Sequence, residues 1–566
     1  MAVGGRGHLS GGRRVRGSAG RWQGKVPRRR GARKPGRLAF PPLSSAGGAD
    51  GGLGPARSSD GRLRVVAPTE RLSSGIVGTA GGQGHAFAVS QLFALLLGVI
   101  SPNPAEVVAP APAAEQAHRA DGGDDLSYEA VLLAAVERHP IVRAAVEGQG
   151  VAEAEVLADR GAFDPLVVAK AAVYPVGGYR SYAVGTEVRQ YTPFWGITGY
   201  VGYRIGLGDF PVYRMEDRTL DRGEVRAGLR IPVIRDGPID ARRAALQKAR
   251  IAVQRAKCEV RAEVLATAGD AARAYWAWVV TAAKRDVATV ILAMARRRQG
   301  QIERGIALGA RAEIEAADNG QLVADRSAKL ADAERRYRNA VADLRYALTG
   351  TTLRIPDRPP RLPWFDEPPA RISRPDVDAD VRAALSARPD VCIEMRKRED
   401  AQVDLRLARN RMAPKLYADV GVSDDFGAGD PKLDPTELAV GVVFEVPLLL
   451  RAARGQRKAA ERKVAAADAK IAAIAAKVRA ELEKRHSDVV GTHERMVHLD
   501  DRRRAARRVM EAERTRFARG ASSLVVVNLR ELAYADATFA YLDAVYDHLV
   551  ASAEYDLARG ELPSKR

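Results

Sequence analysis

Residues 451–519 read RAARGQRKAAERKVAAADAKIAAIAAKVRAELEKRHSDVVGTHERMVHLDDRRRAARRVMEAERTRFAR, a run without proline. Alanine, glutamate, lysine and arginine dominate it, and these residues are strong helix formers. Small apolar residues recur three and four positions apart, as on one face of a helix: Val464, Ala467, Ile471, Ile474, Val478 and Leu482. At 1.5 Å per residue such a helix reaches roughly 100 Å, so we expect it to pack lengthwise against partners of similar length.

Helical patterns also occur in residues 127–160, 240–301, 310–348, 376–411 and about 521–560. Pro140 and Pro389 interrupt the first and fourth of these stretches, because proline cannot donate the interior hydrogen bond of a helix. We expect a glycine-rich turn, with Gly300, Gly305 and Gly309, to separate the second from the third. Residues 351–375 hold seven prolines and are expected to form an extended connector.

Between these helices the apolar period changes from 3.6 to two, which is typical of β-strands. The alternation is clear over residues 167–173, 225–233, 416–422 and 438–446. Residues 176–222, which lie between the first two of these stretches, are rich in aromatic side chains. Such a concentration fits either the core of a soluble β-sandwich or the interfacial girdle of a membrane barrel, and the strands alone do not decide.

The chain has 566 residues and a formal net charge of +20. Residues 1–85 hold 16 Lys and Arg against 3 Asp and Glu, so most of the excess belongs to this stretch. The sequence lacks the interleaved basic and aromatic pattern that nucleic-acid-binding proteins use. Cys258 and Cys392 lie in helical patterns, and we expect two buried, unpaired residues, with a disulfide as the alternative.

Residues 1–60 are largely glycine, arginine, proline and serine, a composition that cannot form a core. We expect residues 1–85 to be a disordered basic extension or the product of a mis-assigned start. Residues 86–100, AFAVSQLFALLLGVI, form an apolar run that is short for a membrane span. With the prolines and alanines that follow, residues 86–114 fit a secretory signal segment, and the alternative is a membrane-anchoring or buried helix. Export of the chain is the first functional expectation.

The two halves of the chain align with each other. The matched pairs are Pro140 with Pro389 and Pro165 with Pro414 (249 apart), Pro232 with Pro447 (215 apart), and Gly350 with Gly560 (210 apart). The fall from 249 to 215 places 34 extra residues between the strands of the first half. An ordered set of such matches indicates an internal duplication of a unit made of helix, strands, long helix, turn and helix.

We therefore divide the chain into a first repeat at 115–350, the connector at 351–375, a second repeat at 376–560 and a tail at 561–566. In each repeat the shorter helices, stacked end to end, would match the long one in length. All strands would then lie at one end of a curved helical wall. Oligomerisation would close the helices around an axis and the strands into a barrel without a free edge.

This layout resembles the TolC family of outer-membrane factors over roughly residues 126–560. The resemblance depends on an ordered set of short motifs. These are LSYEAVLLAAVERHPIVRAA (126–145) and its counterpart VDADVRAALSARPDV (377–391), the prolines 165 and 414 at strand starts, and the hairpin tips LGARAEIEAA (308–317) and ARGASSLVVVN (518–528).

The resemblance implies a mainly α fold with a β part. Duplicated long-helix hairpins would form a periplasmic α-barrel, and the strands of a homotrimer would form a β-barrel in the outer membrane. The function implied is a passive exit channel of a tripartite efflux pump or a type I secretion system, without enzymatic activity, cofactor or metal. Its partners would be outer-membrane lipid, a periplasmic adaptor protein and an inner-membrane pump, and not nucleic acid. The candidate membrane-strand residues are Val225, Leu229, Ile231, Leu438, Val440, Val442 and Phe444.

In this family the hairpin tips form the periplasmic entrance, which here would be residues 305–315 and 517–527. The candidate entrance and adaptor-docking residues are Gly305, Gly309, Arg311, Glu315, Asp318, Phe517, Arg519, Gly520, Ser522, Val526 and Leu529. Family members often carry acidic residues just after the second tip glycine, where this chain has Val526 and Leu529. An apolar constriction and ordinary helix packing are the alternatives for these two residues. Gly309 and Gly520 are expected to take the left-handed conformation that ends a helix.

Motifs for nucleotide binding, zinc proteolysis and nucleophile-elbow hydrolysis do not occur in the sequence. His486 and His493 lie seven apart, whereas a metal pair on a helix needs a spacing of three or four, so we expect these residues and His498 to be solvated. The arginines at 296–298 and 502–504 are expected to be structural or adaptor-facing. The rival interpretation is a non-membrane coiled-coil scaffold with a small soluble β-sheet. A nucleic-acid-binding function would depend on residues 1–85 alone.

Overall fold

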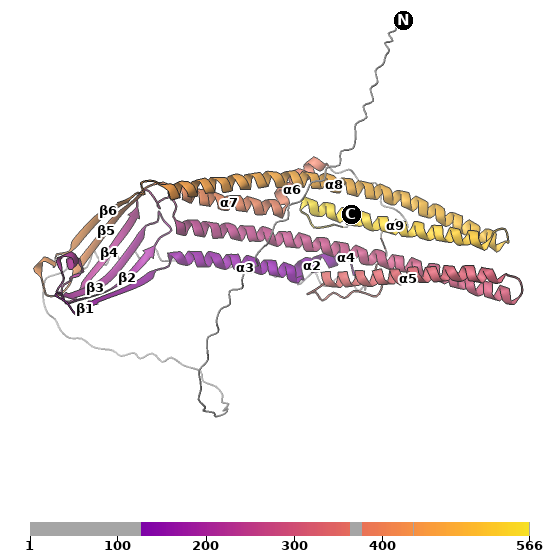
Figure 1. The fold of residues 1–566 in the computed structure, drawn as a ribbon, viewed down its shortest axis with the longest axis horizontal. Coiled ribbons are helices and arrows are strands. Elements are labelled where there is room, and N and C mark those ends of the chain that lie inside the picture. Colours follow the sequence, from indigo (N-terminus) through magenta and orange to yellow (C-terminus); the bar gives the residue numbers. More distant parts are fainter. Residues whose placement is uncertain (1–125, 361, 363–375, 434, 565–566) are drawn as a thin grey trace, which may run out of the picture. The chain divides into compact units, whose positions relative to one another are not determined.

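The computed structural model describes residues 126–360, 362, 376–433 and 435–564. The basic extension 1–85, the signal-like segment 86–114 and most of the connector lie outside the described residues. The described part consists of helices and one antiparallel sheet (Figure 1). The prediction of a mainly α fold with a β part is therefore confirmed.

The same order of elements occurs twice. The first repeat contains α2 (Tyr128–Arg138), α3 (Pro140–Arg160), β1 (Leu166–Tyr174), β2 (Ser181–Tyr191), β3 (Thr198–Gly208), β4 (Glu224–Pro232), α4 (Ala241–Ala307) and α5 (Glu313–Ala347). The second contains α6 (Val377–Ala387), α7 (Pro389–Asn410), β5 (Lys415–Asp425), β6 (Glu437–Glu445), α8 (Arg451–Ala518) and α9 (Leu524–Arg559). The extra residues of the first repeat thus form β2 and β3.

Local signals in the sequence explain most helix ends. The Ser127 hydroxyl accepts a hydrogen bond from Ala130 N (3.1 Å) at the start of α2, as an N-cap does. The carboxylate of Asp240 accepts one from Arg243 N (2.8 Å) at the start of α4. Pro140 and Pro389 each occupy the first turn of a new helix, where a missing N–H costs nothing.

The predicted end of α4 near residue 301 is wrong. The helix runs through Gly300 and Gly305 to Ala307, and of the three glycines only Gly309 has a positive φ, 70°. A glycine inside a helix costs roughly 1 kcal/mol relative to alanine. Packing of α4 against α5 and α9 along this part outweighs that cost.

Each long helix is flanked by shorter helices of the same repeat. α4 packs against α2, α3 and α5, and α8 packs against α6, α7 and α9. In each repeat the three shorter helices together match the long helix in length to within one residue. The predicted stripe on α8 faces these neighbours, since Ala467, Val478 and Leu482 are buried. Its small side chains allow the helix backbones to approach closely.

The joint between short helices is built alike in both repeats. Gly350, at φ 85°, lies against the bend between α2 and α3, where a Cβ would come within 2.6 Å of Arg138 O. Gly560, at φ 81°, lies against the bend between α6 and α7, where a Cβ would come within 3.2 Å of Arg388 N. Both positions therefore require glycine for its backbone conformation and for its lack of a side chain.

The main hydrophobic core lies where α2, α4, α5 and α9 meet. Its largest side chains include Tyr128, Tyr275, Trp276 and Trp278. Ring centroids of Tyr128 and Trp276 lie 4.9 Å apart, and those of Tyr275 and Trp276 also 4.9 Å apart. Truncating a buried aromatic side chain of this kind costs about 3–5 kcal/mol, so this cluster fixes the middle of α4.

The six strands form one sheet in the order β1-β2-β3-β4-β5-β6, and every neighbouring pair is antiparallel. The strands β1 and β6 are the two edges. Short links join the sheet to α3, α4, α7 and α8 (Figure 1). Because β1 and β5 leave these helices while β4 and β6 return to them, all four links lie at the same end of the sheet.

His493 is buried, so the prediction that it is solvated is wrong, although His498 is exposed. The ring of His493 on α8 packs edge-on against the ring of His548 on α9, with centroids 5.4 Å apart. Burial, together with the neighbouring His493, lowers the pKa of His548 to about 4. His548 is therefore neutral at neutral pH and belongs to the packed interior. Among the described residues no group of three or more His, Cys, Asp and Glu is placed to hold a metal.

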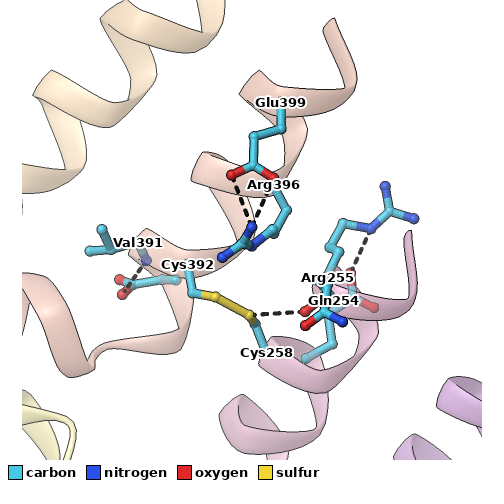
Figure 2. The surroundings of a disulfide bond; sticks show 9 residues. Gln254, Arg255, Cys258, Val391, Cys392, Arg396 and Glu399 are labelled. Carbon is cyan, nitrogen blue, oxygen red and sulfur yellow. Dashed lines mark hydrogen bonds and ion pairs between the residues drawn. A yellow bond between two sulfur atoms is a disulfide. The ribbon is translucent and has the colours of Figure 1, made fainter. Parts of the chain in front are cut away.

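A disulfide joins Cys258 on α4 to Cys392 on α7 (Figure 2). The prediction of two buried, unpaired cysteines is wrong on both counts, because each residue is half-buried and their Cα atoms lie 6.1 Å apart. The two helices pack side by side, which the periodicity of either stretch does not reveal. The bond links the first repeat to the second. Structural disulfides persist in oxidising compartments, which agrees with the expected export.

We expect Cys258→Ser to destabilise the chain, because the bond closes a loop across 134 residues and such a closure stabilises by up to about 5 kcal/mol. The melting temperature of the α-helical signal by circular dichroism is the measurement. Adding reductant to the wild type should produce the same loss, and adding it to Cys258→Ser should produce none. An unchanged melting temperature in both comparisons would contradict the stabilising role.

Candidate functional site

The two hairpin turns, between α4 and α5 and between α8 and α9, share one backbone motif. Gly309 and Gly520 have φ values of 70° and 76°, the left-handed conformation that the sequence predicts. Ala310 N donates to Gly305 O (2.8 Å), and Ala521 N donates to Arg516 O (2.9 Å). This six-to-one hydrogen bond is the Schellman motif that ends many helices. Both tips are therefore sharp turns of equal geometry.

Four of the predicted entrance residues meet around Arg311. Its side chain packs over Gly305, where a Cβ would come within 2.8 Å of Arg311 Cδ. Its guanidinium pairs with Glu315 (2.7 Å) and lies 5.7 Å from the ring centroid of Phe517. The last contact joins the first tip to the second. Arg311 thus connects the two hairpins at their ends.

The other predicted tip residues lie in the turn or the first turns of α5 and α9. Asp318 and Arg519 are exposed, and Ser522 and Val526 are half-buried. Leu529 is exposed, and so are three apolar residues that the sequence reading missed, namely Leu308, Ile314 and Val525. Single apolar residues in or beside a turn do not produce a periodic signal. They give both tips an apolar surface in addition to a charged one.

A buried ionic cluster lies behind the tips, and we call it the Glu531 cluster. It contains Arg298 of α4, Arg326 of α5, Arg514 of α8 and Glu531 of α9. The Glu531 carboxylate accepts hydrogen bonds from Arg298 Nη1 (3.0 Å), Arg326 Nη2 (3.2 Å) and Arg514 Nε (3.0 Å). The side chains of Glu531 and Arg326 are only 1% and 2% exposed. Each of the four tip helices contributes one member.

Electrostatics makes this cluster a strong constraint. Burial alone would raise the pKa of Glu531, but the hydrogen bonds and charges of Arg298 and Arg514 outweigh burial and lower it. Burial lowers the pKa of Arg326 despite its contact with Glu531. Three positive charges thus depend on one buried carboxylate. The sequence showed the arginines at 296–298, whereas a lone glutamate in α9 looks like an ordinary solvated residue.

The arginines at 502–504 have a different setting. Arg503 is buried and pairs with Asp500 (2.7 Å), and its guanidinium lies 4.6 Å from the ring centroid of Tyr541 on α9. Arg504 pairs with the same carboxylate (2.6 Å). These contacts support the structural interpretation of this triplet.

An open groove of about 600 Å³ lies between the two hairpins, lined by residues of α4, α5 and α9. Its walls are part apolar and part charged: Val280, Lys284, Lys329, Asp332, Arg336, Phe539, Asp543 and Tyr546. Lys284 pairs with Asp543 across the groove. The groove thus presents both apolar and charged side chains.

The sheet has one apolar face. Directly opposed residues share a face, so the register of the six strands defines its members. Along β1, β4, β5 and β6 these are Val167, Ala169, Ala171, Val173, Val225, Ala227, Leu229, Ile231, Leu416, Ala418, Val420, Val422, Leu438, Val440, Val442 and Phe444. All seven predicted membrane-strand residues belong to it. Tyr182, Val184, Val188, Val201, Tyr203, Ile205 and Leu207 of β2 and β3 continue it.

This apolar face is not covered by other described residues. Leu438, Val440 and Phe444 are 73%, 68% and 63% exposed. The described part of the chain contains a single sheet. The aromatic residues of 176–222 therefore do not form the core of a β-sandwich. Tyr182, Phe194, Trp195 and Tyr203 are exposed.

The opposite face of the sheet carries charges. Glu187 of β2 pairs with Arg189 (2.7 Å) and with Arg226 of β4 (3.0 Å). Arg230 of β4 pairs with Asp419 of β5 (2.6 Å). The two faces of this sheet are therefore suited to two different surroundings, one apolar and one aqueous.

No described helix is both long and apolar enough to cross a membrane.

Long helical hairpins joined to a small antiparallel sheet define a class of known structures, the outer-membrane channels. The outer-membrane channel OprN matches with a TM-score of 0.57 and 16% identity, over 77% of this chain and 90% of that one. CusC matches with a TM-score of 0.55 and 14% identity, over 82% and 99%. The CmeC outer membrane channel of Campylobacter jejuni matches with a TM-score of 0.54 and 13% identity, over 78% and 88%.

At these identities the likeness concerns the fold. No protein-family model and no curated protein sequence matches the chain. The resemblance to the TolC family that the sequence predicts is confirmed, since the chain has the fold of these outer-membrane channels.

We expect Glu531→Gln to destabilise the packing of the two hairpins by about 3–5 kcal/mol, because it leaves buried arginines without a counter-charge. Glu511→Gln is the matched control, since Glu511 forms an exposed pair with Arg507 (2.9 Å) and such pairs contribute at most about 1 kcal/mol. Thermal unfolding at pH 7 is the measurement.

The pH dependence supplies a second readout. Because the pKa of Glu531 is lowered by folding, its stabilisation is present above the ordinary carboxyl pKa and is lost as pH falls through the folded value. The difference between wild type and Glu531→Gln should therefore shrink in acid. Equal losses in Glu531→Gln and Glu511→Gln would contradict the role of the cluster.

Proposed function

We propose that this chain is a passive exit duct of the outer membrane that serves a tripartite efflux pump or a type I secretion system. Three copies would enclose one tunnel, with the sheets in the outer membrane and the helices in the periplasm. The observation that carries the proposal is the uncovered apolar face of the sheet, on which Asp424, opposite Val225, is the single charged residue of the paired strands.

A lipid environment explains this face. The strands contain 9 to 11 residues, which is enough to cross a bilayer when they are tilted. Apolar residues that face lipid and polar residues that face a lumen alternate in transmembrane barrels. A soluble sheet would instead bury its apolar face against a second layer. The charged face, with its Glu187 and Asp419 pairs, would then line the water-filled lumen.

The two edges of the sheet support an oligomer. An uncovered edge strand presents unpaired backbone groups, and closure into a barrel removes them. The resemblance to the TolC family favours three copies. The tips would form the periplasmic entrance. Their apolar residues and the groove between α5 and α9 would receive the adaptor.

The rival scaffold requires the apolar face to remain in water, and contiguous exposed apolar patches of this kind are rare in soluble proteins. A nucleic-acid-binding function depends on residues 1–85, which lie outside the described residues, and it gains no support from the sheet.

Fractionation of the native cells tests the proposal. We expect the protein in the outer-membrane fraction, and we expect it to migrate on a denaturing gel as a trimer when unheated and as a monomer when boiled. Recovery as a cytoplasmic monomer or dimer would rule out the duct.

Two adjacent valines of β6 separate the membrane and scaffold interpretations. Val442 lies on the apolar face and Val443 on the charged face, and both are exposed. An arginine that faces lipid near the membrane midplane costs about 2–4 kcal/mol. We therefore expect Val442→Arg to reduce the heat-modifiable trimer in the outer membrane, while Val443→Arg leaves it near the wild-type amount. Equal amounts of trimer in the two variants would contradict a lipid-facing role for Val442.

A further inference from the structure

The insertion in the first repeat changes the size of the proposed barrel. The second repeat contributes two strands to the sheet, and the first contributes four. We propose that three copies pair edge to edge, β6 of one with β1 of the next, into one barrel of eighteen strands, six from each chain. This inference rests on the proposed trimeric duct. Without the insertion, two strands from each repeat would give twelve.

The inserted strands are full members of the sheet. β2 pairs with β1 from Ser181 opposite Tyr174 to Arg189 opposite Leu166. β3 pairs with β2 along its whole length and with β4 from Thr198 to Arg204. The apolar face runs across both inserted strands without a charged residue on them. A surface loop would not maintain this alternation.

The turn between β2 and β3 is fixed to the helical end of the sheet. Trp195 Nε1 donates to Pro232 O (2.8 Å) at the end of β4. Gly196 has a φ of 71°, and a Cβ there would come within 2.6 Å of Asp236 O. The Arg242 guanidinium of α4 lies 3.7 Å from the ring centroid of Tyr191. The other strands connect to helices at this end of the sheet, whereas β2 connects directly to β3. The β2–β3 turn packs instead against the link between β4 and α4.

The far end of the insertion is also held. The link between β3 and β4 returns over the sheet, where Thr219 N donates to Gly206 O (2.9 Å). It then joins the loop after β5, because Arg222 N donates to Phe426 O (3.0 Å) and Ala428 N donates to Asp221 Oδ1 (2.7 Å). The inserted strands are thus attached to the second repeat at one end and to α4 at the other.

The two free edges fit each other. β1 and β6 each contain 9 residues, and each places four apolar residues at alternate positions on the same face of the sheet. β1 leaves the helices and β6 returns to them, so neighbouring copies would pair antiparallel, like every pair within the sheet. A second copy of this chain is therefore the partner that suits both edges.

Strand number sets the width of the barrel. With strands about 4.8 Å apart and tilted by about 40°, eighteen strands give a backbone diameter of roughly 36 Å and twelve give roughly 24 Å. Barrels of 16–18 strands leave an aqueous channel. The outer-membrane part would thus admit solutes that a twelve-stranded barrel excludes, and selection of cargo by size would fall to the helical tips.

Cysteine cross-linking tests the edge pairing. Ala171→Cys on β1 is combined in turn with Leu438→Cys, Val440→Cys and Val442→Cys on β6, all on the apolar face. We expect at least one combination to give covalent, reducible trimers on a boiled gel. Ala171→Cys with Ala439→Cys, on the opposite face of β6, is the control and should give at least fivefold less. Cross-links confined to single chains, or none in any combination, would overturn the eighteen-stranded barrel.

A four-stranded variant tests the width. Residues 175–223 are replaced by a copy of residues 426–436, so that β1 joins β4 through the loop of the second repeat. In planar bilayers we expect the size of polyethylene glycol excluded from the external side to fall relative to the wild type. A trimeric variant with an unchanged exclusion size would overturn the inference. If the variant does not assemble, the cross-linking result decides.

These outcomes are distinct from a failure of the proposed function. If the wild-type protein does not form a heat-modifiable trimer in the outer membrane, the duct itself is wrong. If the wild type forms that trimer but the cysteine variants cross-link only within one chain, the proposed duct is retained and the eighteen-stranded barrel is wrong.

Discussion

The uncovered apolar face of the sheet, together with its two free edges, is the constraint on which the rest of the structure depends. Six antiparallel strands present an apolar face and two free edges, and neither is stable in water, because apolar area and unpaired backbone groups both demand partners. In the proposed duct, lipid would cover the face and strands of further copies would pair with the edges. Four helices, α3, α4, α7 and α8, join the sheet at one end (Figure 1). The two long ones, α4 and α8, therefore carry their tips far from the sheet.

The helical part uses two kinds of contact for two purposes. Near the sheet and in the middle, small and aromatic side chains pack densely, and the disulfide between Cys258 and Cys392 ties the repeats together (Figure 2). Behind the tips, the Glu531 cluster holds the two hairpins through charge. A buried ion cluster contributes little net stability compared with apolar packing, but it strongly penalises the loss of one member. Any arrangement of the hairpins that separates Glu531 from its arginines therefore carries that penalty.

Periodicity and duplication made much of this fold predictable. The run at 451–519 became α8 (Arg451–Ala518), and both predicted breaks at Pro140 and Pro389 occur. Contacts between distant segments were not predictable in this way. The disulfide and the burial of His493 depend on which helices become neighbours, and Glu531 carries no local signal. The tip glycines were predictable because a glycine that ends a helix is a local sequence signal. The exposed tip residues Leu308 and Val525 carry no such signal and were not predicted.

The duplication is nearly symmetric in the helices and broken in the sheet. Each repeat supplies the same helices, and both use a glycine, Gly350 or Gly560, at the joint. Only the first repeat adds β2 and β3, so the number of strands is not tied to the number of helices beneath them. An added hairpin of this kind has no helix to rest on, and its inner turn needs another support. Trp195 and Tyr191 supply that support through Pro232 and Arg242. A sheet can thus be widened within a fixed helical wall, provided that each new turn is docked on an existing link between strand and helix.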